Sequence, residues 1–176
     1  MQRSGQFALI LLLLSLSATP INSLFGFHQA LKVRRALGLY AFLYAVLHFS
    51  IFIFLDYGFN LNLIFETLVE KRFIIAGASA LIILAALALT SFRWWMKRLG
   101  KKWKYLHRLV YLAGILVVLH FAWARKGDLF SLQGDILAPL IAGILLLALL
   151  ILRLPIVRKT SSNLHTRIKN RRFVRI

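Results

Sequence analysis

The sequence predicts an all-α integral membrane protein, a helical bundle of about five transmembrane helices. Of its 176 residues, 60% are apolar and only 16% are charged, which lies well outside the usual composition of soluble domains. The apolar residues gather in five stretches of about 20 residues, the length that crosses a hydrocarbon core of about 30 Å. The connections between these stretches are short, which indicates one bundle rather than several domains.

The five predicted spans cover residues 7–25, 37–55, 73–92, 105–123 and 136–154. The first contains Pro20, and we expect its helix to be broken there, with neighbouring helices satisfying the freed backbone groups. The opening run MQRSGQFALILLLLSLSATP also resembles a secretory signal peptide. We favour a genuine span, because cleavage near Ala18 would invert every later connection against the charge pattern of the chain.

The net charge of +18 is distributed along the chain as in a multi-pass membrane protein, and it does not indicate nucleic-acid binding. Basic residues gather before the second and fourth spans and in the tail at 160–176. All five acids fall in the two remaining connections: Asp56, Glu66, Glu70, Asp128 and Asp135. Under the positive-inside rule, the C-terminus and its basic tail are cytoplasmic and the N-terminus is external. A site for membrane lipid headgroups or an acidic partner is the second interpretation of the basic regions.

Three histidines lie inside or at the ends of predicted spans: His48, His107 and His120. Polar side chains in a membrane are costly and usually functional, and imidazole is a common axial ligand of haem iron. The chain has no cysteine, which excludes iron–sulfur clusters and covalently attached c-type haem. These observations predict a haem that histidines hold non-covalently.

The depth of each histidine predicts which of them share an iron. At about 1.5 Å per residue, His48 and His120 both lie in the outer half of the membrane and can bind one haem iron from opposite sides. His107 lies near the cytoplasmic face, about 20 Å from His120 along the helix, so it is a candidate ligand of a second haem. It has no evident partner, because Arg34 stands fourteen residues before His48. His28 would have to fold back to reach it.

The fourth span would need to bend for His107 and His120 to bind two haems that lie one above the other. On an ideal helix, His107 and His120 are about 140° apart, and a kink or tilt near Gly114 would be needed to align them. Small residues recur on the same helix face as His48 and His120, where they permit close approach of a flat cofactor or of another helix. The two stripes are Gly38, Ala41 and Ala45, and Ala113, Leu116 and Val117.

Two longer runs carry a family resemblance. RRALGLYAFLYAVLHF, LGKKWKYLHRLVYLAGILVVLHFAW and the Thr90–Ser91 pair resemble the MsrQ family, the haem-binding membrane subunits of the bacterial protein-methionine-sulfoxide reductase system. More broadly, they resemble ferric-reductase-like transmembrane domains. The resemblance covers most of residues 1–159, the predicted transmembrane haem-binding domain. It implies haem b and FMN as cofactors and His48, His107 and His120 as haem-binding residues.

The resemblance also implies a function. Such proteins are electron-transfer subunits of the bacterial inner membrane rather than catalytic subunits. They pass electrons from the quinone pool or a flavin reductase to a periplasmic molybdopterin subunit that repairs oxidised methionines. The FMN phosphate would most plausibly meet the cations at 93–104. Typical members have six spans and a cytoplasmic N-terminus, so this chain is expected to begin at their second helix.

Two other functions remain open at this stage. The first is a stand-alone ferric or oxygen reductase-type membrane cytochrome b, which would normally carry a flavin and nicotinamide domain that the 22 residues after Leu154 cannot form. The second is a transporter or structural membrane protein whose histidines only make hydrogen bonds between helices. A visible spectrum of the purified protein separates this last function from the others.

Overall fold

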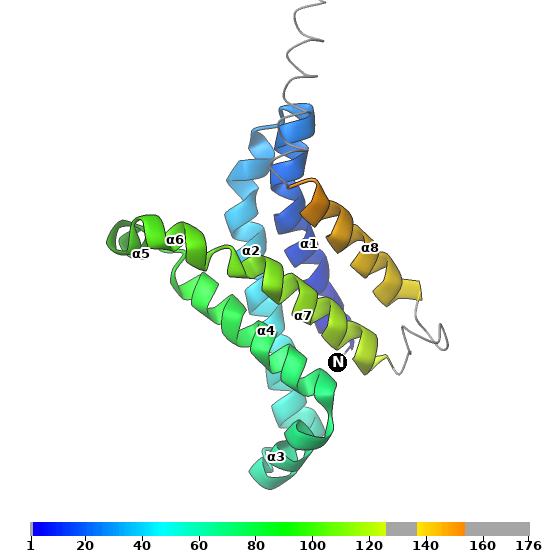
Figure 1. Ribbon diagram of the computed structural model, residues 1–176. Coiled ribbons are helices and arrows are strands. Elements are labelled where there is room, and N and C mark those ends of the chain that lie inside the picture. The colour runs from blue at the N-terminus through cyan, green and yellow to red at the C-terminus, as the bar shows by residue number, and fades with distance from the viewer. Residues whose placement is uncertain (1, 126–136, 154–176) are drawn as a thin grey trace, which may run out of the picture.

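The computed structural model describes residues 2–125 and 137–153, and all of its regular structure there is helical. Figure 1 shows the helices, with these bounds: α1 Gln2–Phe25, α2 Gln29–Ile51, the π-helical turn η1 Phe52–Asp56, α3 Leu61–Glu70, α4 Arg72–Leu89, α5 Arg93–Leu99, α6 Lys101–Leu106, α7 Leu109–Ala124 and α8 Leu137–Ile151. Asp128, Asp135 and the predicted tail at 160–176 lie outside the described residues.

Four helical segments are long and apolar enough to cross a membrane: Arg3–Phe25, Gln29–Asp56, Arg72–Leu89 and Lys101–Ala124. The fifth apolar helix, α8, has 15 residues. These segments coincide with the five predicted spans, so the prediction of an all-α membrane protein is confirmed. Many large apolar side chains on their outer faces are exposed, including Leu43, Ile82 and Leu147, as expected of surfaces that face lipid.

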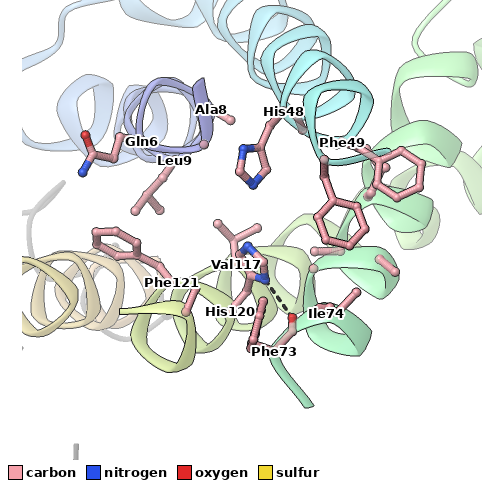
Figure 2. A pocket seen from close by; sticks show the side chains of 18 of the residues that line it. Gln6, Ala8, Leu9, His48, Phe49, Phe73, Ile74, Val117, His120 and Phe121 are labelled. Carbon is pink, nitrogen blue, oxygen red and sulfur yellow. Dashed lines mark hydrogen bonds between the residues drawn. The ribbon is translucent and has the colours of Figure 1, made fainter. Parts of the chain in front are cut away.

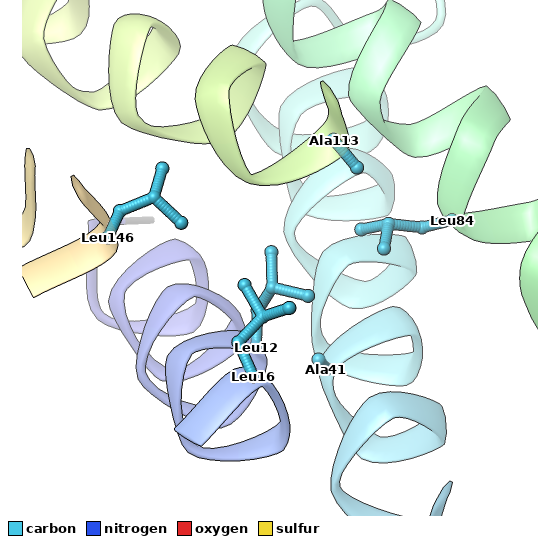
Figure 3. Close-up of a cluster of buried hydrophobic side chains, with 6 residues drawn as sticks. All are labelled: Leu12, Leu16, Ala41, Leu84, Ala113 and Leu146. Carbon is cyan, nitrogen blue, oxygen red and sulfur yellow. The ribbon is translucent and has the colours of Figure 1, made fainter. Parts of the chain in front are cut away.

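Five helices meet at one small core (Figure 3). Helices α1 and α2 form one antiparallel pair, α4 and α7 form a second, and α8 packs beside α7 and α1. The cluster at their junction takes side chains from each of the five: Leu12, Leu16, Ala41, Leu84, Ala113 and Leu146. Ala41 and Ala113 are completely buried, because a methyl side chain lets neighbouring helices approach closely. The predicted stripes therefore serve helix packing at these two positions.

Enlarging the buried alanine of α2 should destabilise the bundle. We expect Ala41→Leu to cost about 1–3 kcal/mol of stability, the usual effect of inserting methylenes into a filled core. That cost lowers the thermal unfolding midpoint in detergent by several degrees, at about 2–4 °C per kcal/mol. Ala36→Leu is the matched control, because Ala36 lies on the same helix and is exposed. Equal midpoints for the two variants would contradict this packing.

Helix α1 runs without interruption through Pro20, so the predicted break there is wrong. Proline has no N–H to donate to the carbonyl four residues earlier, which is that of Leu16. Arg153, which follows α8, supplies the missing donor, since its Nη2 lies 2.6 Å from the Leu16 oxygen. A neighbouring segment thus satisfies the freed carbonyl, as expected of a proline in a membrane helix, and the helix stays intact.

Two connections contain helices that the sequence analysis did not predict. Helix α3 lies in the first acid-bearing connection, and its N-cap Asn60 accepts a hydrogen bond from the Leu63 N–H at 3.3 Å. Helices α5 and α6 lie in the second basic connection, where Gly100 separates them with a φ of 49°, a conformation that glycine adopts without strain. Helix α4 ends at Leu89, three residues before the predicted end of that span.

The fourth predicted span is not one helix. Helix α6 ends at Leu106, a turn at His107 and Arg108 follows, and α7 begins at Leu109. The angular estimate for His107 and His120 assumed a continuous helix, so it does not apply across this turn. Helix α7 continues without interruption through Gly114. A Cβ built there would lie 3.1 Å from Leu146 Cδ1, so the glycine instead permits close packing against α8.

Candidate functional site

An apolar cavity of about 450 Å³ lies among α1, α2, α4 and α7. Its walls include Leu9, Ala45, Ile74, Val117 and Phe121. Figure 2 shows that His48 from α2 and His120 from α7 both point into it from opposite walls. Cavities that bind cofactors are typically apolar with a few convergent polar groups, and here the two imidazoles point toward each other across the cavity, while Gln6, Asp56, Tyr57 and Arg125 also contribute to its lining.

The distance between the two imidazole rings suits a shared metal. Their centroids are 6.1 Å apart and their planes are inclined at 77°. With metal–nitrogen bonds of about 2 Å and about 1.1 Å from each nitrogen to its ring centre, two imidazoles on opposite sides of one metal have centroids about 6 Å apart. The structure therefore brings His48 and His120 together, in an arrangement compatible with two axial ligands.

Each of these rings is held through its Nδ1 atom. His120 Nδ1 lies 2.7 Å from the carbonyl oxygen of Phe73, drawn as a dashed line in Figure 2. A carbonyl only accepts, so Nδ1 carries the proton and the Nε2 lone pair is available to a metal. His48 Nδ1 lies 3.3 Å from Ser4 Oγ. Such outer hydrogen bonds orient metal-binding imidazoles and fix their tautomers.

Two glycines make room for the rings. A Cβ built at Gly77 of α4 would lie 2.6 Å from His120 Nδ1, and one built at Gly5 of α1 would lie 3.2 Å from His48 Cε1. A side chain at either position would press on the imidazole, most severely at Gly77. The sequence analysis missed both glycines. The run AGASA at 76–80, which places small residues in the first half of a span, was a usable signal for Gly77.

The structure places His107 in a separate cluster rather than at the cavity. It lies in the turn before α7, where its Nε2 is 3.2 Å from Thr90 Oγ1 at the end of α4. The ring of Trp103 stacks against it at 4.1 Å between centroids, and the Trp103 indole donates to the Thr90 carbonyl at 2.9 Å. Arg34, which the sequence analysis compared with a possible partner of His107, donates a hydrogen bond from its guanidinium to Thr19 Oγ1. His28 begins α2, where it makes no side-chain capping hydrogen bond.

The described residues do not form a metal site of the usual all-protein kind. Within 2–125 and 137–153, no group of three or more His, Cys, Asp or Glu side chains is arranged to hold a metal ion. A metal bound by His48 and His120 would take its other ligands from a cofactor. A porphyrin supplies four nitrogen ligands in one plane and leaves two axial positions, which is the number of imidazoles at this cavity.

Comparison with known proteins identifies the family. Residues 4–118 match the family model described as ferric reductase like transmembrane component. This chain belongs to that family. Within it, the chain is 40% identical to the protein-methionine-sulfoxide reductase heme-binding subunit MsrQ of Bordetella parapertussis over 147 residues, 84% of this chain and 69% of the relative. This similarity places it among the MsrQ proteins of the ferric reductase-like family.

Other relatives carry the same name. The MsrQ of Xanthomonas campestris pv. campestris (strain 8004) is 43% identical over 79% of this chain and 65% of its own length. That of Herminiimonas arsenicoxydans is 38% identical over 86% of this chain and 68% of its own length. The chain thus spans about two thirds of the length of these MsrQ relatives. No solved structure matches it.

The ferric reductase-like match includes most of the cavity. Residues 4–118 contain the cavity-lining parts of α1, α2 and α4, and of the α7 residues in the lining they contain Val117. They include His48 and His107, together with Gly5 and Gly77. His120 lies two residues beyond the matched range, and its place at the cavity comes from the structure.

Proposed function

We propose that this chain is a haem-b transmembrane electron-transfer subunit of a protein-methionine-sulfoxide reductase system. One observation carries the proposal. His48 and His120 face each other across an apolar cavity with 6.1 Å between ring centroids, and their Nδ1 atoms are engaged elsewhere. The names of the relatives, which describe heme-binding subunits of that reductase system, support the same cofactor and the same assembly.

The residues present fit a haem. His48 and His120 would hold the iron, and Leu9, Val117 and Phe121 would keep water from it. When bound, the haem supplies one-electron redox chemistry, while the protein positions it and tunes its potential. Arg125, at the end of α7, also lines the cavity, and its cation suits a haem carboxylate, because arginine forms strong charge-assisted hydrogen bonds with carboxylates.

The charges at the two ends of the bundle support one orientation of the chain in the membrane. The described acids Asp56, Glu66 and Glu70 lie in η1 and α3, at one end, whereas α5 and α6 carry their cations at the other. We assign the basic end to the cytoplasm, which leaves the C-terminus inside and the N-terminus outside in the bacterial inner membrane. Lys71 and Arg72 at the start of α4 are exceptions, because they are basic residues at the end that carries the acids.

This orientation places the cavity near the external acceptor. Asp56 and Tyr57, which follow α2, line the cavity together with Arg125. Electrons would enter at the basic end, from the quinone pool or a cytoplasmic flavin reductase. They would leave near α3 to a periplasmic molybdopterin-containing methionine-sulfoxide reductase. FMN, where present, would use the cations that α5 and α6 gather between Arg93 and Lys104.

The visible spectrum of the purified full-length chain tests the haem directly. We expect a Soret band, a reduced α-band of low-spin haem and a pyridine haemochrome of haem b, with at least one haem per chain. Reduction by quinol or by a flavin reductase, followed by reoxidation with the periplasmic reductase and a methionine sulfoxide, tests the role as an electron carrier. A preparation without a Soret band, even when cells are supplied with haem, would favour a transporter or structural protein instead.

The family similarity leaves a second function for the same site, a stand-alone ferric or oxygen reductase. The two functions differ in the acceptor. An electron carrier for a protein partner should be reoxidised much faster by that partner than by a ferric chelate or oxygen. Faster reoxidation by the small acceptors would favour the stand-alone reductase.

His107 should affect electron entry rather than the haem at the cavity. It contacts Thr90 and Trp103 and is absent from the cavity lining. We therefore expect His107→Ala to slow haem reduction by quinol or a flavin reductase several-fold. The spectrum of the haem between His48 and His120, here called the outer haem, should stay largely intact. Thr90→Val, which removes the hydroxyl next to His107 Nε2 but keeps the side-chain shape, should have a smaller effect in the same direction.

Two outcomes would contradict this role for His107. Loss of the outer haem signal in His107→Ala would mean that His107 ligates that iron. An unchanged reduction rate would assign the residue to structure. The haem-to-protein ratio separates ligation of a second haem, which lowers the ratio, from a role in holding a quinone or flavin, which does not.

A further inference from the structure

A second, smaller cavity lies at the basic end of the bundle, among α1, α2, α7 and the residues after α8. Its volume is about 130 Å³, and polar side chains dominate its lining: Thr19, Ser23, Arg34, Tyr111 and Arg153. At about 30 Å³ per water molecule, it has room for a group about the size of a phosphate, and it is much too small for a whole cofactor.

Two guanidinium groups share one neutral acceptor at this cavity. Arg34 Nη1 lies 3.2 Å from Thr19 Oγ1, and Arg153 Nη2 lies 3.3 Å from the same oxygen. Among the described residues, Arg153 also donates to the Leu16 carbonyl at 2.6 Å and to the Tyr111 hydroxyl at 2.9 Å. All of these acceptors are uncharged, so none of them offsets the repulsion between the two cations.

The chain brings no carboxylate to this place among its described residues. Asp56, Glu66 and Glu70 lie in η1 and α3, at the opposite end of the bundle. Within the part of the chain that the structure describes, the buried Nε of Arg153 has no hydrogen-bond partner. A buried donor without an acceptor is destabilising, and an arginine presents its donors as a planar fork that matches an oxyanion.

We propose that Arg34 and Arg153 form a binding site for a phosphate group at the cytoplasmic end of the bundle. The oxyanion accepts hydrogen bonds from both guanidiniums, and its charge removes the repulsion between them. Because Arg153 also holds α1 through the Leu16 carbonyl, the bound anion fixes α8 against α1 and α7. The phosphate belongs either to an anionic lipid headgroup at the membrane surface or to a soluble phosphate compound.

Thermal unfolding of the full-length protein in an uncharged detergent and phosphate-free buffer tests the site. Inorganic phosphate should raise the unfolding midpoint by about 2–4 °C, the shift expected for roughly 1 kcal/mol in a chain of this size. Sodium chloride at equal ionic strength should not. In a parallel series, nanodiscs of phosphatidylcholine with increasing phosphatidylglycerol separate the two sources of the phosphate group.

Arg34→Gln should abolish the phosphate response, and Arg34→Lys should retain a weaker one. Arg35→Gln is the matched control, since Arg35 is the next residue of α2 but does not line the cavity, and it should respond as the wild type does. Arg34 is preferred over Arg153 for the test because Arg153→Gln also removes the donor to the Leu16 carbonyl. The readout is protein unfolding, so it is independent of whether haem is bound.

A response to phosphatidylglycerol alone identifies a lipid headgroup, and a response to inorganic phosphate alone identifies a soluble ligand, provided that Arg34→Gln removes it. A response to both that Arg34→Gln removes identifies a phosphate site that accepts either source. The proposal is overturned if neither compound stabilises the wild type, if chloride is as effective as phosphate, or if Arg34→Gln responds as strongly as Arg35→Gln.

Discussion

His48→Ala and His120→Ala should each remove most of the low-spin haem signal of the purified protein. The two rings face each other at 6.1 Å between centroids, so the loss of either imidazole leaves the iron with one axial protein ligand. We expect at least a several-fold fall in the haem-to-protein ratio and a shift of the remaining haem to a high-spin spectrum. Absorption spectra, with electron paramagnetic resonance of the oxidised form, measure both effects.

His28→Ala is the matched control for these two variants. It also removes an imidazole, but His28 lies at the start of α2 and does not line the cavity. It should therefore keep the wild-type spectrum and haem content. The assignment of the ligands would be wrong if either cavity variant kept both the spectrum and the haem ratio of the wild type.

Gly77→Ala should have nearly as large an effect without removing any ligand. The new Cβ would lie 2.6 Å from His120 Nδ1 and 2.9 Å from its Cε1, closer than real contacts allow. His120 must rotate away, which breaks its 2.7 Å hydrogen bond to the Phe73 carbonyl. Because that bond orients the ring, we expect a several-fold loss of haem or a shifted low-spin signal, measured on the same preparations.

Alanine substitutions at two other glycines should have smaller effects. At Gly5 the new Cβ would lie 3.2 Å from His48 Cε1, a contact that small adjustments relieve, so Gly5→Ala should weaken haem retention less. At Gly143 of α8 the new Cβ would lie 3.6 Å from Val118 Cγ1, an ordinary contact. Gly143→Ala should therefore leave the spectrum unchanged. If Gly77→Ala had the same haem content and spectrum as Gly143→Ala, then His120 would not be held by the contacts described.

The membrane fold could be predicted from the sequence because it depends on composition and length, which are local properties. The short helices could not, because α3, α5 and α6 have only 10, 7 and 6 residues, so no apolar stretch of spanning length marks them. The break at His107 was missed for a related reason. The run from Tyr105 to Trp123 is apolar enough to read as one span, yet a turn at His107 and Arg108 separates α6 from α7.

The pairing of His48 with His120 followed from depth, since helix rise alone places both in the same half of the membrane. The residues that hold the pair come from contacts between helices distant in the chain. The Phe73 carbonyl on α4 reaches His120 across 47 residues, and Gly5 on α1 lies against His48. The donor to the Leu16 carbonyl, Arg153, comes from 137 residues away, which no local pattern around Pro20 reveals.

The position of iron in the purified protein tests the central claim most directly. Anomalous X-ray scattering at the iron absorption edge locates the metal in crystals of the full chain, relative to the side chains around it. We expect iron between His48 and His120, bound by the Nε2 atom of each. Iron bound beside His107 with none at the cavity, or a haem at the cavity that neither His48 nor His120 contacts, would contradict the account.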